Sequence, residues 1–204
     1  MESNELEHEI ISFYNELIKS KKGYLQLFSD LQIQREGWFS GELMNYFNDH
    51  VHKMAPENRE VRVFYQGNKK YKVIDFRIDV NGQSCWIELK HILIGNQKKY
   101  NLRDSQEKRE NKFPLKFYFN IKNPSSVAKD VAKLNELKLD PAFVLAFISV
   151  NNNYITSRDM LKEDLEKILK LENISAILKG WDFDYASSSG YFILKVGQEN
   201  NQIS

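Results

Sequence analysis

Residues 71–91 read YKVIDFRIDVNGQSCWIELKH, and their pattern predicts two β-strands joined by a tight turn. The turn is Asn81-Gly82, because these two residues readily adopt the positive φ that a two-residue hairpin turn requires. Counting back from the turn predicts how the two strands pair. The expected opposite pairs are Val80 with Gln83, Asp79 with Ser84, Arg77 with Trp86, and Asp75 with Glu88.

The two faces of this hairpin differ in polarity, because side chains alternate between faces along a strand. One face carries the charged residues and a tryptophan: Asp75, Arg77, Asp79, Trp86, Glu88 and Lys90. The other face carries no charge: Ile74, Phe76, Ile78, Val80, Cys85, Ile87 and Leu89. We expect the uncharged face to be buried. Burial fixes the register, since a slip by one residue would bury the charges.

The carboxylates of Asp75 and Glu88 are expected to repel each other across the ladder, and this arrangement needs a reason. A divalent cation is one, because Mg²⁺ is held by one or two carboxylates together with water and phosphate oxygens. Lys90 lies two residues after Glu88 on the same face, beside such a metal and its attacking water. The alternative is an ion-pair network on a solvated face, in which Arg77 neutralises both carboxylates.

Asp75 in one strand, followed by Glu88-Leu89-Lys90 in the next, resembles the motif of the PD-(D/E)xK, or restriction-endonuclease-like, nucleases. Ile74 stands where the motif has proline. The resemblance implies that Asp75, Glu88 and the backbone carbonyl of Leu89 bind Mg²⁺ or Mn²⁺. It also implies that Lys90 positions the attacking water or stabilises the developing charge.

In this family the first core helix often contributes a glutamate to the metal site. A helix is predicted to begin near Phe39-Ser40, with Ser40 as its N-cap, so the matching residue is Glu42. By itself an acidic residue in a first turn usually complements the helix dipole. Glu36, just before this helix, is the alternative.

The remaining periodicities predict an α/β (α+β) fold with a mixed central sheet flanked by helices. Residues 40–150 read as helix, three strands, helix and strand, which is the αβββαβ core order of the nuclease family. We expect one domain over 1–204, with an N-terminal helical extension at 1–36, the core at 37–150, and a C-terminal helix and strand at 151–204. The finer expectations are helical spacing at 4–31 with a break at Lys21-Lys22-Gly23, a strand or buried connector at 113–121, a buried strand at 142–150, and helices at 158–171 and 174–179.

A polar segment, 91–111, follows the motif and contains more basic than acidic residues. Its cations are candidate phosphate contacts: Lys98, Lys99, Arg103, Lys108 and Arg109. A solvated loop or helix is the equal alternative, because charge runs usually are solvated. The net charge of +1 for all 204 residues gives no overall electrostatic case for nucleic acid.

The composition favours a globular cytoplasmic protein. Hydrophobic residues make up 42% of the chain, and the single cysteine, Cys85, cannot form an intrachain disulfide. No apolar run approaches the ~18 residues of a membrane span, and the N-terminus lacks a signal-peptide pattern.

The expected function is therefore that of a metal-dependent DNA endonuclease, either a type II restriction enzyme or a related phage-defence nuclease. Such enzymes usually cut as homodimers, and the N-terminal helices are a candidate dimer surface. RNA stays open as a substrate. The alternative is a non-catalytic nucleic-acid-binding or structural module that keeps the nuclease fold.

Overall fold

The computed structural model describes residues 3–31, 35–51, 55–67, 69–80, 82–94, 116–123, 126–150, 158–184 and 186–197. In chain order the elements are α1 (Ser3–Leu31), α2 (Glu36–His50), the 3₁₀ turn η1 (Pro56–Asn58), β1 (Arg59–Tyr65), β2 (Lys70–Val80), β3 (Gln83–Ile94), α3 (Lys116–Phe119), α4 (Val127–Glu136), β4 (Ala142–Val150), α5 (Arg158–Leu171), β5 (Ala176–Asp184) and β6 (Ser189–Val196). The strands form one sheet in the order β1-β2-β3-β4-β6-β5. Only β3 and β4 pair in parallel, so the predicted α+β class with a mixed sheet is confirmed.

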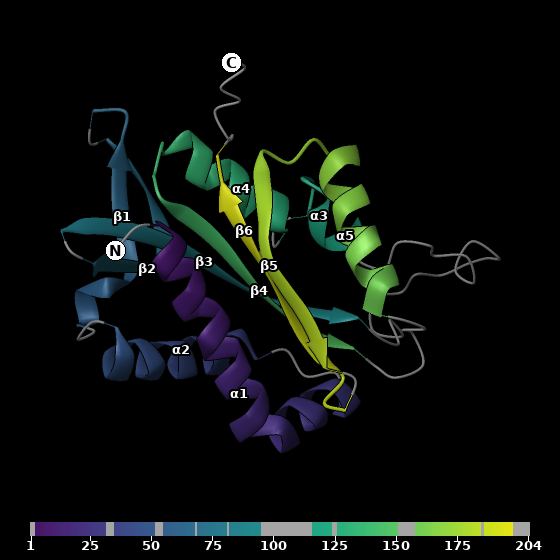
Figure 1. The fold of residues 1–204 in the computed structure, drawn as a ribbon. Helices are drawn as coiled ribbons and strands as arrows, with labels where there is room; N and C mark the ends of the chain where they lie inside the picture. Colours follow the sequence, from purple (N-terminus) through teal and green to yellow (C-terminus); the bar gives the residue numbers. More distant parts are fainter. Residues whose placement is uncertain are drawn as a thin grey trace, which may run out of the picture.

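Helices cover both faces of the sheet. In Figure 1, α1 and α2 lie on one face, and α3, α4 and α5 lie on the other. The central strand β4 is buried at all nine positions, as the sequence predicts. Its side chains alternate between two cores: Phe143 and Leu145 pack with α1 and α2, whereas Val144 and Ala146 pack with the opposite helices.

The apolar stripe of α1 is used to cover the sheet. Leu6, Ile10, Phe13 and Leu17 are all buried in the core that α1 shares with α2. This part of α1, proposed from the sequence as a dimer surface, is therefore occupied within the chain. The predicted break is confirmed, because the backbone of Lys21 has non-helical torsions of φ −120° and ψ 19°.

The hairpin register is confirmed near the turn and differs farther from it. The pairs Val80–Gln83, Asp79–Ser84 and Arg77–Trp86 form as predicted, and the ladder continues to Phe76–Ile87. The predicted pair of Asp75 with Glu88 is not part of it. Instead, a carboxylate oxygen of Asp75 accepts a hydrogen bond from the backbone N–H of Leu89 at 2.8 Å. A side chain thus takes the place of a backbone partner.

At the same point, the side chains of strand β2 switch from one face of the sheet to the other. Phe76 and Ile78 pack against α1 and α2, but Ile74 packs in the opposite core, so its predicted placement with them is wrong. On the neighbouring strand, Glu60 has a φ of +50°, uncommon for a residue other than glycine. We call this place, where β2 parts from β3 at Asp75, the fork.

Three other expectations are corrected by tertiary contacts. Helix α2 begins at Glu36 rather than near Ser40, which is buried inside the helix and is not its N-cap. For 113–121 the expected strand is wrong, because the described end holds the short helix α3; fully buried Phe119 agrees with the other expectation, a buried connector. The predicted helix at 174–179 is wrong, because from Ala176 the chain pairs with β6 as strand β5. Helix α5 has the predicted bounds.

Candidate functional site

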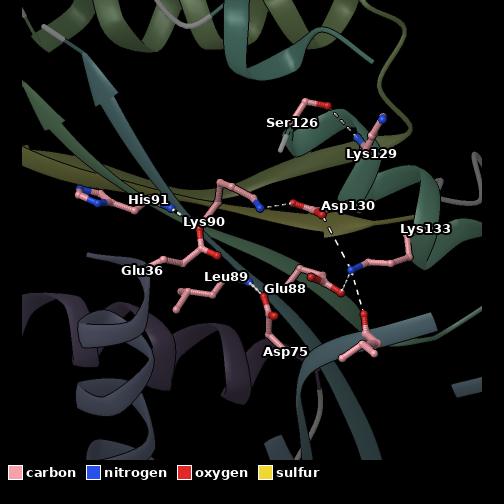
Figure 2. A network of polar contacts seen from close by, with 11 residues as sticks. Glu36, Asp75, Glu88, Leu89, Lys90, His91, Ser126, Lys129, Asp130 and Lys133 are labelled. Carbon is pink, nitrogen blue, oxygen red and sulfur yellow. Dashed lines mark hydrogen bonds and ion pairs between the residues drawn. The ribbon is translucent and has the colours of Figure 1, made fainter. Parts of the chain in front are cut away.

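Four carboxyl groups and two ammonium groups meet around the fork. They come from three parts of the fold: Glu36 at the start of α2, Asp75, Glu88 and Lys90 on β2 and β3, and Asp130 and Lys133 on α4. Figure 2 shows ion pairs linking Lys90, Asp130, Lys133 and Glu88, while Glu36 and Asp75 accept hydrogen bonds from backbone N–H groups of β3. We refer to these six residues as the fork site.

Glu88 is the most deeply buried charged residue of the fork site, with 2% of its surface exposed. Burial and the nearby charge of Asp75 raise the pKa of Glu88 to about 9, and the ammonium group of Lys133 offsets part of this rise. Lys133 forms an ion pair with Glu88 and donates a hydrogen bond to the carbonyl of Val73 at 3.0 Å. Helix α4 is thereby tied to both strands of the fork.

Lys90 points to the same side as Glu88 and pairs with Asp130, its Nζ lying 3.0 Å from Oδ2 of the aspartate. Burial alone would lower the pKa of Lys90, but the carboxylates of Asp130, Glu36 and Asp75 together raise it above its ordinary value. Lys90 therefore stays charged at neutral pH. Burial also raises the pKa of Asp130, against the opposing effects of Lys90 and Lys133.

Glu36, not Glu42, lies at the fork site. A carboxylate oxygen of Glu36 accepts a hydrogen bond from the backbone N–H of His91 at 3.2 Å. Burial raises its pKa, Lys90 and the His91 amide lower it, and Asp75 adds to the rise. Glu42 instead forms an ion pair with Lys21 of α1 at 3.7 Å. Because α2 begins earlier than predicted, Glu36 occupies its first turn.

His91 holds the start of α2 against β3. Its Nδ1 accepts a hydrogen bond from the backbone N–H of Arg35 at 2.9 Å, so the proton is on Nε2, which lies 2.9 Å from the hydroxyl of Ser149. Burial lowers the pKa of His91 to about 3, which keeps the ring neutral. Its side chain lies on the opposite face of β3 from Lys90, and it positions Glu36 through the chain around Arg35.

The alternative predicted from the sequence is an ion-pair network in which Arg77 neutralises Asp75 and Glu88. Arg77 pairs with Asp79, its guanidinium nitrogen lying 3.1 Å from the carboxylate, and not with Asp75 or Glu88. An ion-pair network does exist, but it is largely buried and its cations are Lys90 and Lys133. The other basic candidates, Lys98, Lys99, Arg103, Lys108 and Arg109, lie outside the described residues.

Asp130 and Lys133 were not expected in the site from the sequence. One signal was available for Asp130: it lies three residues after Val127 and four before Leu134, both buried, so it belongs to the buried stripe of α4. Lys133 follows Asp130 by three residues, on the same side of the helix, and their charged groups are 3.9 Å apart. That both reach β3 depends on how α4 packs, which its sequence does not specify.

The donor chemistry of the fork site suits a hard divalent cation. Within the described ranges, no three histidine, cysteine, aspartate or glutamate side chains are grouped so as to hold a metal ion. Mg²⁺ does not require such a group, because one or two carboxylates with water and phosphate oxygens hold it in many phosphoryl-transfer sites. Asp75 and Glu88 supply carboxylate oxygens. Burial raises the pKa of Glu88 most, the charge of Asp75 adds to the rise, and a bound cation would favour the ionised carboxylate.

Two further findings bear on what the chain is. No helix in the part of the chain that the structure describes is long and apolar enough to cross a membrane. Comparisons with protein-family models, with curated proteins and with solved structures find no match to this chain. Any functional conclusion therefore depends on the geometry and chemistry of the fork site.

Proposed function

We propose that this protein is a metal-dependent nuclease that hydrolyses phosphodiester bonds in DNA. The observation that carries the proposal is that Asp75, Glu88 and Lys90 lie together at a break in the β2–β3 ladder. At this break the carboxylate of Asp75 accepts a hydrogen bond from the backbone N–H of Leu89. Burial and the neighbouring charge of Asp75 raise the pKa of Glu88, and a pKa shifted in this way is typical of functional sites.

The surrounding fold supports the same proposal. The elements between 36 and 150 include a helix, three antiparallel strands, a helix, and a strand parallel to the third, in the order that the resemblance to PD-(D/E)xK nucleases implies. The first of these helices contributes Glu36 to the fork site. The likeness in motif and topology adds to the chemistry of the fork site, which carries the proposal.

The residues would divide the work as follows. Asp75, Glu88 and the carbonyl of Leu89 would hold Mg²⁺ or Mn²⁺, and Glu36 would hold a second ion or its water. A bound cation supplies Lewis acidity and lowers the pKa of its water. Lys90, held by Asp130, would position the attacking water or stabilise the charge that develops on the phosphate oxygens. Because the pKa of Glu88 is about 9, cation binding must displace its proton, and metal affinity should rise with pH.

The type of nuclease is a further proposal. A stand-alone endonuclease of the restriction or phage-defence kind would act in the cytoplasm, which suits the buried free thiol of Cys85. Cutting as a homodimer would need a surface other than the buried stripe of α1. RNA remains an alternative substrate, since nothing in the fork site distinguishes the two polymers.

A cleavage assay tests the proposal. The full chain is incubated with plasmid and phage DNA in Mg²⁺, in Mn²⁺ and in chelator, beside Lys90→Ala and a control, Lys170→Ala, which removes an exposed lysine from the end of α5. We expect metal-dependent cutting that is lost in Lys90→Ala and kept in Lys170→Ala. Discrete fragments would identify a sequence-specific enzyme.

One observation favours a second candidate function. Each ammonium group of the fork site already contacts a carboxyl group of the chain, Lys133 with Glu88 and Lys90 with Asp130, so the chain itself holds both in place without a metal ion. A non-catalytic nucleic-acid-binding module would use the same fold without metal. Binding of DNA in chelator, with no cutting in either metal, would establish this alternative and refute the nuclease.

A further inference from the structure

Beyond the fork, β1 and the outer half of β2 form a two-stranded ribbon at the left of Figure 1. The register pairs Arg62 with Val73 and Phe64 with Tyr71, which places these four side chains on one face of the ribbon. All four are exposed, including 54% of Phe64 and 50% of Tyr71. We call these four residues the ribbon patch. It holds three of the seven exposed large hydrophobic side chains among the described residues, so exposed apolar surface is concentrated here.

The aromatic rings of the ribbon patch are arranged as a platform. The ring centroids of Phe64 and Tyr71 are 5.7 Å apart, with their planes tilted by 57°. The guanidinium carbon of Arg62 lies 5.1 Å from the centroid of the Tyr71 ring. Exposed aromatic rings combined with an arginine are the surface on which proteins stack the bases of unpaired nucleic-acid strands.

The ribbon is also strongly basic. Residues 59–73 contain five cationic side chains and one acidic side chain, a net charge of +4, whereas the whole chain carries +1. The five cations are Arg59, Arg62, Lys69, Lys70 and Lys72. This local charge favours a polyanion over a second copy of the chain, because two such ribbons would repel each other.

The ribbon leads directly to the fork site. A pocket between α2 and the start of the ribbon is lined by Arg59 and Glu60 of β1 and by Glu36 and Asp75 of the fork site. Along β2, Tyr71 precedes Asp75 by four residues, about 13 Å at ~3.3 Å per residue. A strand of nucleic acid lying across the pocket would therefore reach both places.

We propose that the ribbon patch binds a nucleic-acid strand with unpaired bases, stacking them on Phe64 and Tyr71, while Arg62 on the same face contacts its phosphates. Unpaired bases are required because the bases of an intact duplex are stacked on each other and do not expose their ring faces. This inference deepens the proposed nuclease function: it names a single-stranded or locally unpaired segment beside the bond to be cut.

The test uses the full chain in chelator, where metal-dependent cutting does not occur. Two fluorescein-labelled probes are compared by anisotropy: a mixed-sequence DNA single strand of about 30 nucleotides and a duplex of the same sequence. We expect the wild type to prefer the single strand. In the Phe64→Ala/Tyr71→Ala variant, affinity for that strand should fall at least about tenfold, because both rings on which bases stack are removed.

A matched control removes two exposed apolar side chains elsewhere, in the variant Ile121→Ala/Leu171→Ala. It should bind the single strand with wild-type affinity. Thermal midpoints of both variants should stay close to that of the wild type, since the removed side chains are half or more exposed. A second arm replaces Arg62 with alanine. The slope of log affinity against log salt concentration should become less steep, by the amount expected for the loss of about one phosphate contact.

Several results would overturn the inference: no binding of either probe by the wild type, equal losses in the ribbon variant and the control, or tighter binding of the duplex. Light scattering provides a further check, because a lower molar mass of the ribbon variant would identify the patch as a contact between copies of the chain. Failure of the two proposals is distinguishable. Patch-dependent binding without cutting would refute the nuclease alone, and cutting with unchanged binding by the ribbon variant would refute this inference alone.

Discussion

Strand β3 pairs very differently along its two edges. On one edge it pairs in parallel with β4 at nine consecutive positions, from Trp86 to Ile94. On the other edge it pairs with β2 only from Gln83 to Ile87. Beyond Ile87 the strands separate, and the Asp75 carboxylate accepts a hydrogen bond from the backbone N–H of Leu89. The continuous edge lies between two apolar cores, whereas the interrupted edge gathers charge. Where a ladder stops, backbone groups and side chains become available for chemistry.

The largest expected effect is at the interrupted edge. Replacing Asp75 with asparagine removes a carboxylate from the fork site, but the side-chain oxygen can still accept the Leu89 N–H. We therefore expect initial cleavage rates to fall by about a thousandfold, on the order of 4 kcal/mol in activation free energy, with little change in thermal midpoint. The matched control is Asp79→Asn on the same strand, which should cut within about twofold of wild type. Equal rates in the two variants would exclude Asp75 from the reaction.

A change at the continuous edge should instead affect stability. Leu145 of β4 pairs with Leu89 and is fully buried. We expect Leu145→Ala to lower the free energy of unfolding by about 2–5 kcal/mol, measured by urea denaturation, because it removes buried methyl groups and leaves a cavity. Leu171→Ala, at a residue 70% exposed, should change it by no more than about 0.5 kcal/mol. A small loss in Leu145→Ala would mean that this edge carries less of the fold than its burial indicates.

The buried charge at the interrupted edge makes stability depend on pH. Burial and Asp75 raise the pKa of Glu88 from 4.5 to about 9, so the folded state binds a proton that the unfolded state releases above pH 4.5. Below pH 6.5 the buried, neutral His91 acts in the opposite sense. Stability of the metal-free protein should therefore fall mainly as pH rises from about 6.5 to about 9, by on the order of a few kcal/mol. Glu88→Gln should flatten this dependence in urea titrations at several pH values. A wild type as stable at pH 9 as at pH 5 would contradict the buried, protonated state of Glu88.

The smallest effect separates the two candidate glutamates of α2. We expect Glu36→Gln to reduce the cleavage rate about tenfold, because its carboxylate lies within the electrostatic reach of Lys90 and Asp75. Glu42→Gln should cut as the wild type does. It should also lose at most about 0.5 kcal/mol of stability, because its ion pair with Lys21 is partly exposed. If Glu42→Gln instead cut more slowly than Glu36→Gln, Glu42 would be the glutamate of α2 that acts in cleavage.

Local pattern was sufficient for the part of the hairpin next to its turn. Alternating polarity and the Asn81-Gly82 turn predicted the pairs from Val80–Gln83 to Arg77–Trp86, since both signals act within a few residues. The helical periods of α1 and α5 and the apolar run of β4 were read in the same way. The prediction of Asp75 opposite Glu88 was wrong because simple counting assumes an unbroken ladder, and a side-chain oxygen replaced the backbone partner.

The start of α2 shows the opposite case. Ser40 has the chemistry of an N-cap, yet the helix begins four residues earlier, where His91 of β3 binds both the amide of Arg35 and, through its own amide, the carboxylate of Glu36. A local preference worth about 1 kcal/mol was overridden by contacts from a residue 55 positions away in the chain.

By itself the sequence determined the mixed α+β character, the hairpin and the placement of Asp75, Glu88 and Lys90 on neighbouring strands, because strand and helix periods and turn chemistry are local properties. Only the tertiary structure decided the fork, the choice of Glu36, the entry of Asp130 and Lys133 into the site, and the exposure of Phe64 and Tyr71. These depend on how α2, α4 and β1 pack on the sheet, and such packing is settled by long-range contacts that no local pattern in a single sequence records.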